Sequence, residues 1–435
     1  MWRNWSGLAQ SSPARVAAPR TTGEVAAEVS RARDEGGTVK MVGTGHSFTP
    51  IAAPEGTMLR PDLMRGVVDV DRSDPAAPTV TVLAGTPLHE LNHALELLGL
   101  TLHNMGDIAE QTIAGAISTG THGTGGRTAG LAAQVVGLEL VSGTGEVLEA
   151  RPGKNADVLD VARLGLGALG VLTRVTLAVE PLRLLRAHEE AMSWDEALAT
   201  FDDRTARADH VDGYWFPHSD RVQLKQNTRT DLPVEAAEPL GRLTEALDDG
   251  FVQNTLFGAL TAAANRAPGV IPTMNRVSSR LLSSRTYSDV PHRVFTARRS
   301  VVFREMEYAV PRDVGLDVLR EVRRLVDASD LRISFPVELR TAPADDVPLS
   351  TASGRAAFYL AFHTHRDADH RAYFDLVEPV LRAAGGRPHW GKLHSLTAVD
   401  LEPLYPRFAD VLAMRERLDP DRVLVNDHLR RVLGD

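Results

Sequence analysis

The sequence predicts an α+β protein with two domains, and three observations indicate this class. Helix-like and strand-like segments alternate through the first part of the chain, until Pro181 follows a long apolar run. Aromatic residues gather soon afterwards, and an arginine-rich stretch follows them. With 435 residues, the chain is long enough for each domain to have its own hydrophobic core. We therefore predict one domain over residues 10–182 and a second over residues 183–435.

The first domain is expected to alternate helices and strands. A helix is predicted over residues 21–37, where Thr21 can cap the first turn and glycine ends the apolar pattern. Another is predicted over residues 86–99, with Thr86 as the cap and Pro87 at the first helical position. The other expected elements are a strand and turn at 39–48, strands at 67–71 and 79–85, a hairpin at 135–150, and a helix, glycine turn and strand over 156–182.

The second domain is predicted to combine strands with amphipathic helices. The arginine-rich region over residues 236–285 is expected to be helical, and a last helix is expected just before residues 419–427. The other expected elements are strands at 301–310, 332–343 and 356–365, and helices at 313–329 and 370–384.

The composition excludes several classes of protein. A hydrophobic content of 43% with 24% charged residues is typical of a globular domain, and a net charge of −9 argues against nucleic-acid binding. No apolar run is long enough for a membrane span, and the first residues lack the apolar core of a signal peptide. The chain has no cysteine, which removes disulfides, thiolate metal sites and thiol catalysis. We therefore expect a cytoplasmic protein.

Two glycine-rich stretches predict a cofactor site in the first domain. The stretch at 39–50 is an apolar strand followed by a turn that contains Gly43, Gly45 and His46, and the second stretch covers residues 112–126. Glycine permits positive φ and close approach of the backbone, whose N–H groups can bind a phosphate. Two such stretches suggest a large phosphate-bearing cofactor held mostly by backbone. Each stretch alone is better explained as a tight structural turn.

Two further matches to known patterns are rejected on their context. GLGALG at 165–170 fits the dinucleotide fingerprint, but the fingerprint needs a strand before it and a helix after it, and the expected order here is the reverse. HELNH at 89–93 fits the zinc-protease pattern, with Glu110 available as a third ligand. On a helix, His89 and His93 fall opposite the apolar face, so they point to solvent rather than into a cleft.

A third pattern, HTHRDADH at 363–370, leaves two interpretations open. His363 and His365 lie two apart on an expected strand and so share a face, with Asp367 close behind. They can ligate a metal, as in binuclear zinc hydrolases, although an extra residue precedes the last histidine. They can also line a pocket for a polar substrate, which the neighbouring strand favours.

That neighbouring strand carries the residues best suited to catalysis. Glu338 and Arg340 lie two apart in FPVELRT and project to one face. A carboxylate beside a guanidinium can hold a polyhydroxylated substrate and accept a hydroxyl proton, although an ordinary ion pair would show the same pattern. Lys392 is one of only four lysines in the chain. Beside a cofactor ring, its ammonium can stabilise developing negative charge, although it can equally be a surface residue in a turn.

The chain resembles a known family through four of its segments. VGTGHSFTP (42–50), LTLHNMGDIAEQTIAGAISTGTHGTG (100–125), ELRT (338–341) and HWGK (389–392) resemble, in order and spacing, the sugar-lactone and alditol oxidases. These are FAD enzymes of the vanillyl-alcohol-oxidase superfamily. The resemblance covers nearly the whole chain and weakens across residues 185–300. It implies a two-domain FAD-linked oxidase fold, with an N-terminal FAD-binding domain, a C-terminal substrate (cap) domain and a C-terminal segment that returns to the flavin.

The resemblance also implies roles for individual residues. His46 matches the histidine that bonds covalently to the flavin 8α-methyl group. Glu338, Arg340 and Lys392 match catalytic and substrate positions, and Thr112 and His365 match further substrate-binding positions. The remaining implied FAD contacts are Met41, Val42, Gly43, Thr44, Gly45, Ser47, Gly106, Thr112, Gly115, Ile117, Gly120, His122, Gly123, Thr124, Gly125, Val171 and His389.

The implied reaction moves a hydride from a carbinol C–H to flavin N5 while a base accepts the hydroxyl proton. The expected substrate is an aldono-1,4-lactone such as gulono- or arabinono-lactone. An alditol such as xylitol or sorbitol is the alternative, but His365 stands where alditol oxidases carry a threonine. A zinc hydrolase that uses His363, His365 and Asp367 is the alternative from another class. No metal is expected in the preferred interpretation.

The electron acceptor is expected to be molecular oxygen, which makes the protein an oxidase. The resemblance places Gly106 against the flavin, where a glycine goes with oxygen access and an alanine with its obstruction. One methyl group can fill the space that a diatomic molecule needs in a close-packed site. A turn after Asn104 is the plainer explanation of this glycine, and a protein or quinone acceptor remains the alternative.

Overall fold

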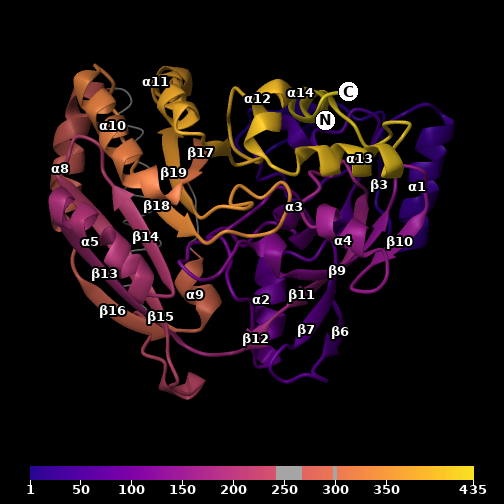
Figure 1. Cartoon of the computed structure of the whole chain (residues 1–435), viewed down its shortest axis with the longest axis horizontal. Helices are drawn as coiled ribbons and strands as arrows, with labels where there is room; N and C mark the ends of the chain where they lie inside the picture. The colour runs from indigo at the N-terminus through magenta and orange to yellow at the C-terminus, as the bar shows by residue number, and fades with distance from the viewer. Residues whose placement is uncertain (242–266, 297–300) are drawn as a thin grey trace.

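Two sheets form the framework of the first part of the chain in the computed structural model, which describes residues 1–241, 267–296 and 301–435 (Figure 1). The smaller sheet is parallel, in the order β3 (Arg15–Ala17), β5 (Thr57–Leu59) and β4 (Val39–Met41). The larger is antiparallel, in the order β10 (Val147–Ala150), β9 (Val135–Val141), β11 (Val171–Ala178), β7 (Thr79–Leu83) and β6 (Val67–Asp71). Short pairs join β1 (Trp2–Arg3) to β2 (Gln10–Ser11) and β8 (Leu100–Thr101) to β12 (Glu180–Pro181).

The helices of this part follow the predicted pattern, with one difference. Helix α1 (Thr22–Asp34) begins at Thr21, whose hydroxyl accepts a hydrogen bond from Glu24 N at 3.2 Å, as predicted. Helix α2 (Leu88–Leu97) is also present, but the predictions of Thr86 as its cap and of Pro87 as its first residue are wrong, because Pro87 is the cap. The Thr86 hydroxyl donates to the Leu83 carbonyl and accepts from Gly66 N. Because the turn after β7 uses this hydroxyl, the helix begins after Pro87. Two shorter helices, α3 (Ile113–Ser118) and α4 (Ala156–Ala162), complete this part.

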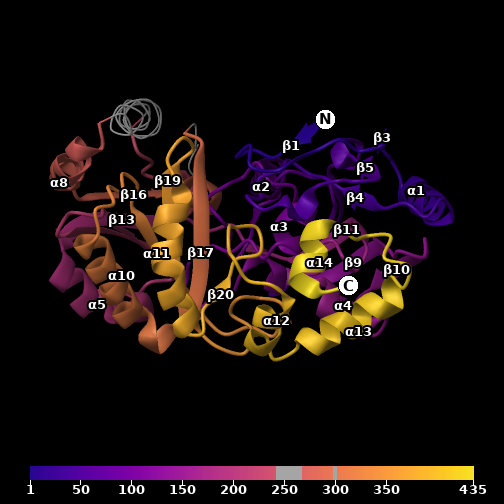
Figure 2. The ribbon, with the colours of Figure 1, turned by 90° about the horizontal axis from the view of Figure 1, so that it is seen from above.

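An eight-stranded antiparallel sheet forms the framework of the second part. Its order is β16 (Arg285–Asp289), β13 (Leu185–Ser193), β15 (Arg221–Arg229), β14 (His210–Trp215), β18 (Val337–Ala342), β19 (Ala357–His365), β17 (Phe303–Pro311) and β20 (Arg387–Pro388). Four helices pack on one face: α5 (Trp194–Arg207), α8 (Ile271–Leu281), α10 (Gly315–Ala328) and α11 (His370–Ala383). The other face is turned toward the first part of the chain (Figure 2). A short helix, α9 (Pro291–Phe295), follows β16.

The end of the chain returns to the first part. Helices α12 (Ala398–Leu401), α13 (Phe408–Leu418) and α14 (Asp427–Leu433) lie beside it in both ribbon views (Figures 1 and 2). Asn426 fixes this return, because its amide reaches the carbonyls of Pro50, Ile51 and Ala53 at 3.1, 3.0 and 3.0 Å. The last residues therefore hold the segment that follows the first glycine turn.

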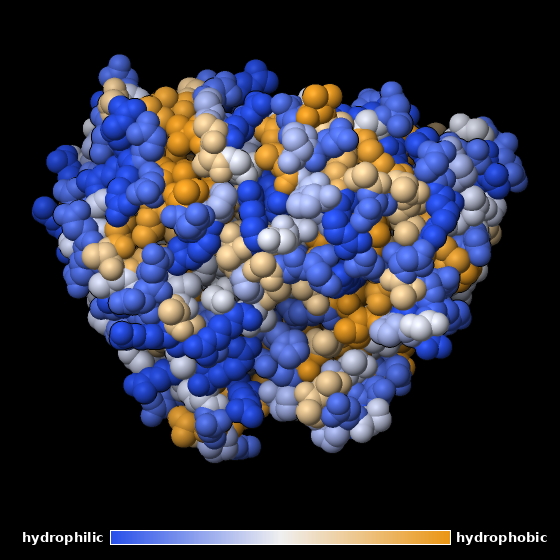
Figure 3. Space-filling model, viewed as in Figure 1, coloured by the Kyte–Doolittle hydropathy of each residue, from blue (hydrophilic) through white to orange (hydrophobic). Residues whose placement is uncertain are grey.

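The predictions for the segment 165–170 and for the arginine-rich region are confirmed in part. The segment 165–170 lies between a helix and a strand, as predicted, which confirms that it is not a dinucleotide fingerprint. Of the region expected to be helical, residues 271–281 form α8, residues 285–289 form a strand that pairs with β13, and residues 242–266 lie outside the described residues. Within the described residues, no helix is long and apolar enough to cross a membrane. On the face shown in Figure 3, hydrophilic residues separate small apolar patches.

Candidate functional site

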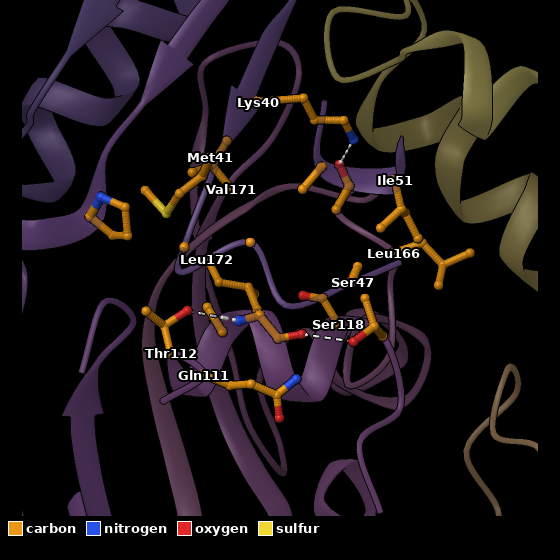
Figure 4. A pocket seen from close by; sticks show the side chains of 18 of the residues that line it. Lys40, Met41, Ser47, Ile51, Gln111, Thr112, Ser118, Leu166, Val171 and Leu172 are labelled. Carbon is orange, nitrogen blue, oxygen red and sulfur yellow. Dashed lines mark hydrogen bonds between the residues drawn. The ribbon is translucent and has the colours of Figure 1, made fainter. Parts of the chain in front are cut away.

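Two adjoining cavities lie along the glycine-rich stretches. The larger has a volume of about 870 Å³, including space open to solvent, and is lined by residues of both stretches and of the turn after α4 (Figure 4). The smaller has a volume of about 470 Å³ and reaches the polar face of the eight-stranded sheet. His46, Ser47, Gln111 and Thr119 line both cavities, so the two are continuous.

The two glycine stretches approach each other closely at the larger cavity. Gly45 has a φ of +72°, which L side chains rarely adopt. A Cβ on Gly43 would lie 2.6 Å from the Thr112 hydroxyl oxygen, so only glycine fits there. That hydroxyl in turn accepts a hydrogen bond from Gly115 N at the start of α3. The first turn is therefore shaped by the second stretch, and both present backbone to the cavity.

His46 stands where the two cavities meet. Its ring stacks on Trp5 with centroids 5.7 Å apart, and its Nδ1 is buried without a hydrogen-bond partner in the described structure. Burial lowers the pKa of His46, which favours the neutral imidazole. A neutral ring nitrogen with no partner is free to form a bond to a ligand in the cavity.

The structure brings most, but not all, of the expected FAD contacts to a cavity wall. Those in the larger cavity are Met41, Gly43, Thr44, Gly45, His46, Ser47, Thr112, Gly115 and Val171. Gly106, His122 and His389 line the smaller one. The others, Val42, Ile117, Gly120, Gly123, Thr124 and Gly125, line neither. Gly125 N donates to Thr341 O at 2.8 Å, and the Thr124 hydroxyl donates to Val211 O. This end of the second stretch thus joins the two parts of the chain.

Arg340 is the centre of a buried cluster of carboxylates. Its Nη2 donates to Glu338 at 2.6 Å and its Nε donates to Asp212 at 3.2 Å. Asp107, from the loop before α3, lies 3.8 Å from Nη2. Arg340 and Asp107 line the smaller cavity, whereas Glu338 lies behind Arg340. Burial raises the pKa of Asp212 to about 6, even though Arg340 opposes the shift.

Lys392 is held by a second buried carboxylate. Its ammonium donates to Glu305 on β17, and His363 lies 3.6 Å from the other oxygen of the same carboxylate. Burial alone would raise the pKa of Glu305, but Lys392 and His363 hold it well below its usual range. Lys392 therefore points into the smaller cavity as one half of an ion pair.

A third buried carboxylate lies between two histidines. Glu307 is 3.2 Å from His122 Nε2, and the His122 ring stacks on Tyr359 at 3.8 Å. Burial opposes ionisation of Glu307, but His122 holds its pKa at about 2. With His389 these residues form the one group in the described chain with the spacing of a metal site. Gly391 N donates to His389 Nδ1, however, which leaves the proton on Nε2. We therefore interpret the cluster as an ion pair.

The histidines proposed for a zinc hydrolase do not converge. His365 lies 3.7 Å from Asp367 at the end of β19, and neither lines either of these two cavities. His363 instead lies against Glu305 and the Pro336 carbonyl. His89 and His93 are exposed on α2, as expected from their place opposite the apolar face. In the described part of the chain, neither pattern assembles a set of metal ligands.

Comparison with known proteins decides the family. A model of the D-arabinono-1,4-lactone oxidases matches residues 175–432, and a model of the FAD-binding domain matches residues 13–151. The chain belongs to the D-arabinono-1,4-lactone oxidase family. The resemblance predicted from the sequence is thereby confirmed, with FAD as the cofactor and oxidation or reduction as the chemistry.

Relatives within and beyond this family match almost the whole chain. An L-gulono-1,4-lactone dehydrogenase of Mycobacterium tuberculosis is 39% identical over 100% of this chain and 99% of its own length. An L-gulonolactone oxidase of Mus musculus is 31% identical over 99% of this chain and 98% of its own. The crystal structure of a cholesterol oxidase from Brevibacterium sterolicum superposes with a TM-score of 0.81 at 17% identity, over 99% of this chain and 96% of that one. This last likeness confirms the two-domain FAD-binding fold.

Several site residues were missed by the sequence interpretation. Glu305 and Glu307 lie two apart in VVFREMEYAV, which is the same spacing that identified Glu338 and Arg340. Two carboxylates on one face of an otherwise apolar strand were a usable signal. Asp212 gave a weaker one, since VDGYW shows a single acid among residues of mixed character. Asp212 reaches Arg340 because β14 pairs with β18, and the sequence does not reveal this pairing.

The substitution Asp212→Asn should make this family member more stable and less active. An unfolded aspartate titrates near pH 4. The folded protein therefore binds more protons between about pH 4 and pH 6, and its free energy of unfolding falls as pH rises through that window. Asparagine stays neutral, so the variant should gain about 3 kcal/mol at pH 8 and nothing below about pH 4. Thermal unfolding at the two pH values measures the difference.

The activity of the same variant should fall, because Arg340 loses an ionised partner. Asp203→Asn, an exposed change on α5, is the control and should alter neither property. Equal thermal midpoints for wild type and Asp212→Asn at pH 8 would contradict the raised pKa. Undiminished activity would contradict the importance of the negative charge that Asp212 places beside Arg340.

Proposed function

We propose that this chain oxidises a carbinol of an aldono-1,4-lactone, with L-gulono- or D-arabinono-1,4-lactone as the substrate. The observation that carries the proposal is the position of Arg340 and Lys392, which line one cavity next to His46. The names of the relatives support the lactone class, since they include L-gulonolactone oxidases and D-arabinono-1,4-lactone oxidases. An alditol is the weaker candidate, because nothing in the compared relatives' names points to it.

The residues of the larger cavity fit FAD. The cavity extends along both glycine stretches, and its wall at Gly43 has no room for a Cβ. The buried Nδ1 of His46 has no hydrogen-bond partner in the described structure. The backbone of residues 43–47 and of the second stretch would hold the cofactor, and His46 would bond to it covalently. When bound, FAD supplies the acceptor for the substrate hydride.

The substrate would lie in the smaller cavity, between side chains of both domains. Arg340 would bind substrate oxygen atoms through Nη1, since its described hydrogen bonds use Nε and Nη2. We assign the base for the hydroxyl being oxidised to Glu338, which lies behind Arg340 and does not itself line this cavity, so the proton would have to reach it past the guanidinium. Lys392, held by Glu305, would place positive charge where negative charge develops. Thr112 and His365 are less well placed for this role, because neither lines the smaller cavity.

Three finer assignments stay predictions. The division at residue 182 is supported by the ends of β12 and β13, which belong to different sheets. Molecular oxygen as acceptor is supported by Gly106, which lines the smaller cavity. A cytoplasmic location rests on the sequence alone. An assay of lactones and polyols, with oxygen and with an artificial acceptor, tests substrate and acceptor together. Oxidation of polyols but not lactones would overturn the proposed substrate.

The flavin of the wild-type protein should be covalently bound through His46. Acid-precipitated wild type should stay yellow, whereas His46→Ala should release its flavin into the supernatant, because no other described group at that point has a free ring nitrogen. His93→Ala, an exposed histidine on α2, is the control and should retain colour. Colourless wild-type precipitate would exclude the covalent bond.

The substitution Glu338→Gln should slow substrate oxidation while the cofactor stays bound. Glutamine keeps the shape and one acceptor for Arg340, so packing is preserved while the base is lost. Removal of a positioned base typically costs about 10² to 10⁴ in rate. Stopped-flow measurement of flavin reduction gives the rate, and Glu321→Gln, half-buried on α10 and outside both cavities, is the control. A decrease smaller than about tenfold, below that range, would be evidence against the assignment.

The substitution Gly106→Ala should slow reoxidation by oxygen by about tenfold or more, which corresponds to about 1.4 kcal/mol. The added Cβ would lie 3.0 Å from Thr121 Cγ2 and 3.3 Å from the His122 carbonyl, so it both fills space and presses on its neighbours. Mixing the anaerobically reduced enzyme with oxygenated buffer measures the rate.

A second variant separates these two effects. Gly106→Ala combined with Thr121→Ser removes the methyl group that the new Cβ would touch, and so relieves strain. Slow reoxidation should persist in the double variant if the Cβ blocks oxygen. Recovery of the wild-type rate would attribute the effect to strain, and slow wild-type reoxidation would contradict an oxidase.

A further inference from the structure

Lys40 is a buried lysine of the larger cavity, and among the described residues its one hydrogen bond goes to a neutral carbonyl. It lies on β4, is 4% exposed, and donates to Gly167 O at 3.0 Å. Figure 4 shows its ammonium group extending over the cavity. An ammonium has three N–H donors, so two remain for another partner. The position is three residues before Gly43, at the entrance to the first glycine turn.

The other lysines of the chain differ from Lys40 in one respect. Lys154 pairs with Glu149 and Lys392 with Glu305, while Lys225 lies 4.0 Å from Glu189. Among the described residues, Lys40 forms no such ion pair with a carboxylate. A buried charge without a paired counter-charge destabilises a protein unless a ligand supplies that charge.

The charged groups around Lys40 do not provide full compensation. Asp419 and Glu55 are the acids that favour its charged form, and Arg415 opposes it. Both oxygens of Asp419 already accept backbone hydrogen bonds, from Val423 N at 2.8 Å and Leu424 N at 2.9 Å. His428 on α14 is close enough for Lys40 to lower the pKa of its ring. Burial lowers the pKa of Lys40 itself to about 7.

The position of Lys40 identifies the kind of ligand. The walls around its end of the cavity include apolar Ile51, Leu166 and Leu424 and the backbone of Gly167. An anionic oxygen that enters this space would find one ammonium and little competing water, a setting in which a charge-assisted hydrogen bond is strong. Because the same cavity fits FAD, the anion available there is a phosphate of the ADP half of the cofactor.

We propose that Lys40 binds a phosphate oxygen of the ADP half of FAD and is the side-chain cation of a site otherwise made from backbone. This assignment rests on the placement of FAD in the larger cavity. It gives the lysine a function beyond its hydrogen bond to the turn at Gly167. It also makes cofactor binding depend on pH, because an anion restores the charge on an amine that loses its proton near pH 7 in the bare cavity.

The test uses the full-length chain with His46→Ala, so that FAD binds reversibly and its affinity can be measured by flavin fluorescence. Into this background we would place Lys40→Met, Lys40→Arg and, as the control, Lys154→Met, which changes an exposed lysine. Lys40→Met should raise the Kd of FAD by about 10- to 100-fold, the loss expected for one charge-assisted hydrogen bond. The Kd of ADP, measured as a competitor of FAD, should rise by the same factor.

The arginine variant tests the charge independently of packing. Between pH 6 and pH 9 the affinity of the Lys40 protein for FAD should fall, because binding requires uptake of a proton above pH 7. Arginine stays protonated throughout this range, so Lys40→Arg should bind FAD with little dependence on pH. This comparison remains decisive if Lys40→Met does not fold, which thermal unfolding would reveal.

Failure of the phosphate contact and failure of the proposed function give different results. Unchanged Kd values for FAD and ADP in Lys40→Met would overturn the proposal and leave Lys40 as a tie to the Gly167 turn. A rise for FAD without a rise for ADP would also overturn it, since the contact would then lie outside the ADP half. A flat pH profile in the Lys40 protein would do the same. Normal FAD binding through Lys40 without oxidation of any lactone would refute the proposed function alone.

Discussion

The burial of ionised side chains on one face of the eight-stranded sheet is the constraint on which the rest of the structure depends. A carboxylate in this environment is destabilising unless a basic group pairs with it. Glu338 has Arg340, Glu305 has Lys392 and Glu307 has His122. Loss of one partner from a buried pair typically costs about 3–5 kcal/mol. The face can therefore be buried only when segments from distant parts of the chain have been brought to it.

This requirement explains why the site lies where the two domains meet. His122 comes from the second glycine stretch, and Lys392 from the segment that follows β20, so the sheet face needs both to complete its pairs. The backbone bond from Gly125 to Thr341 and the contact from Asn426 to the Pro50 carbonyl hold these segments in register. The cavity that results is lined by charged side chains held in ion pairs, which offer donors and acceptors to a polyhydroxylated ligand.

The sequence predicted the parts of this site that follow local rules. Alternation along one strand places Glu338 and Arg340 on the same face, and glycine chemistry locates the turn at His46. The role of Asp212 could not be predicted from the sequence. Its partner, Arg340, lies more than a hundred residues away, on a strand whose pairing with β14 depends on the tertiary fold. Thr86 failed as a cap for a similar reason, since its hydroxyl is used by the turn after β7. Lys40 stood out only as a rare residue type until burial gave it meaning.

Overall similarity to the relatives does not identify the electron acceptor. A relative named dehydrogenase is 39% identical to this chain, and a relative named oxidase is 31% identical, and both align along its whole length. Fold, cofactor and substrate groups are therefore common to proteins with either name. On our proposal, the difference lies beside the flavin at Gly106, where one methyl group can fill the space that oxygen needs. At Gly106 that space is bounded by the Thr121 methyl group and the His122 carbonyl, and His122 is itself fixed by Glu307. If Gly106 controls oxygen access as proposed, a mutation of the Glu307–His122 pair should also change the rate of reoxidation.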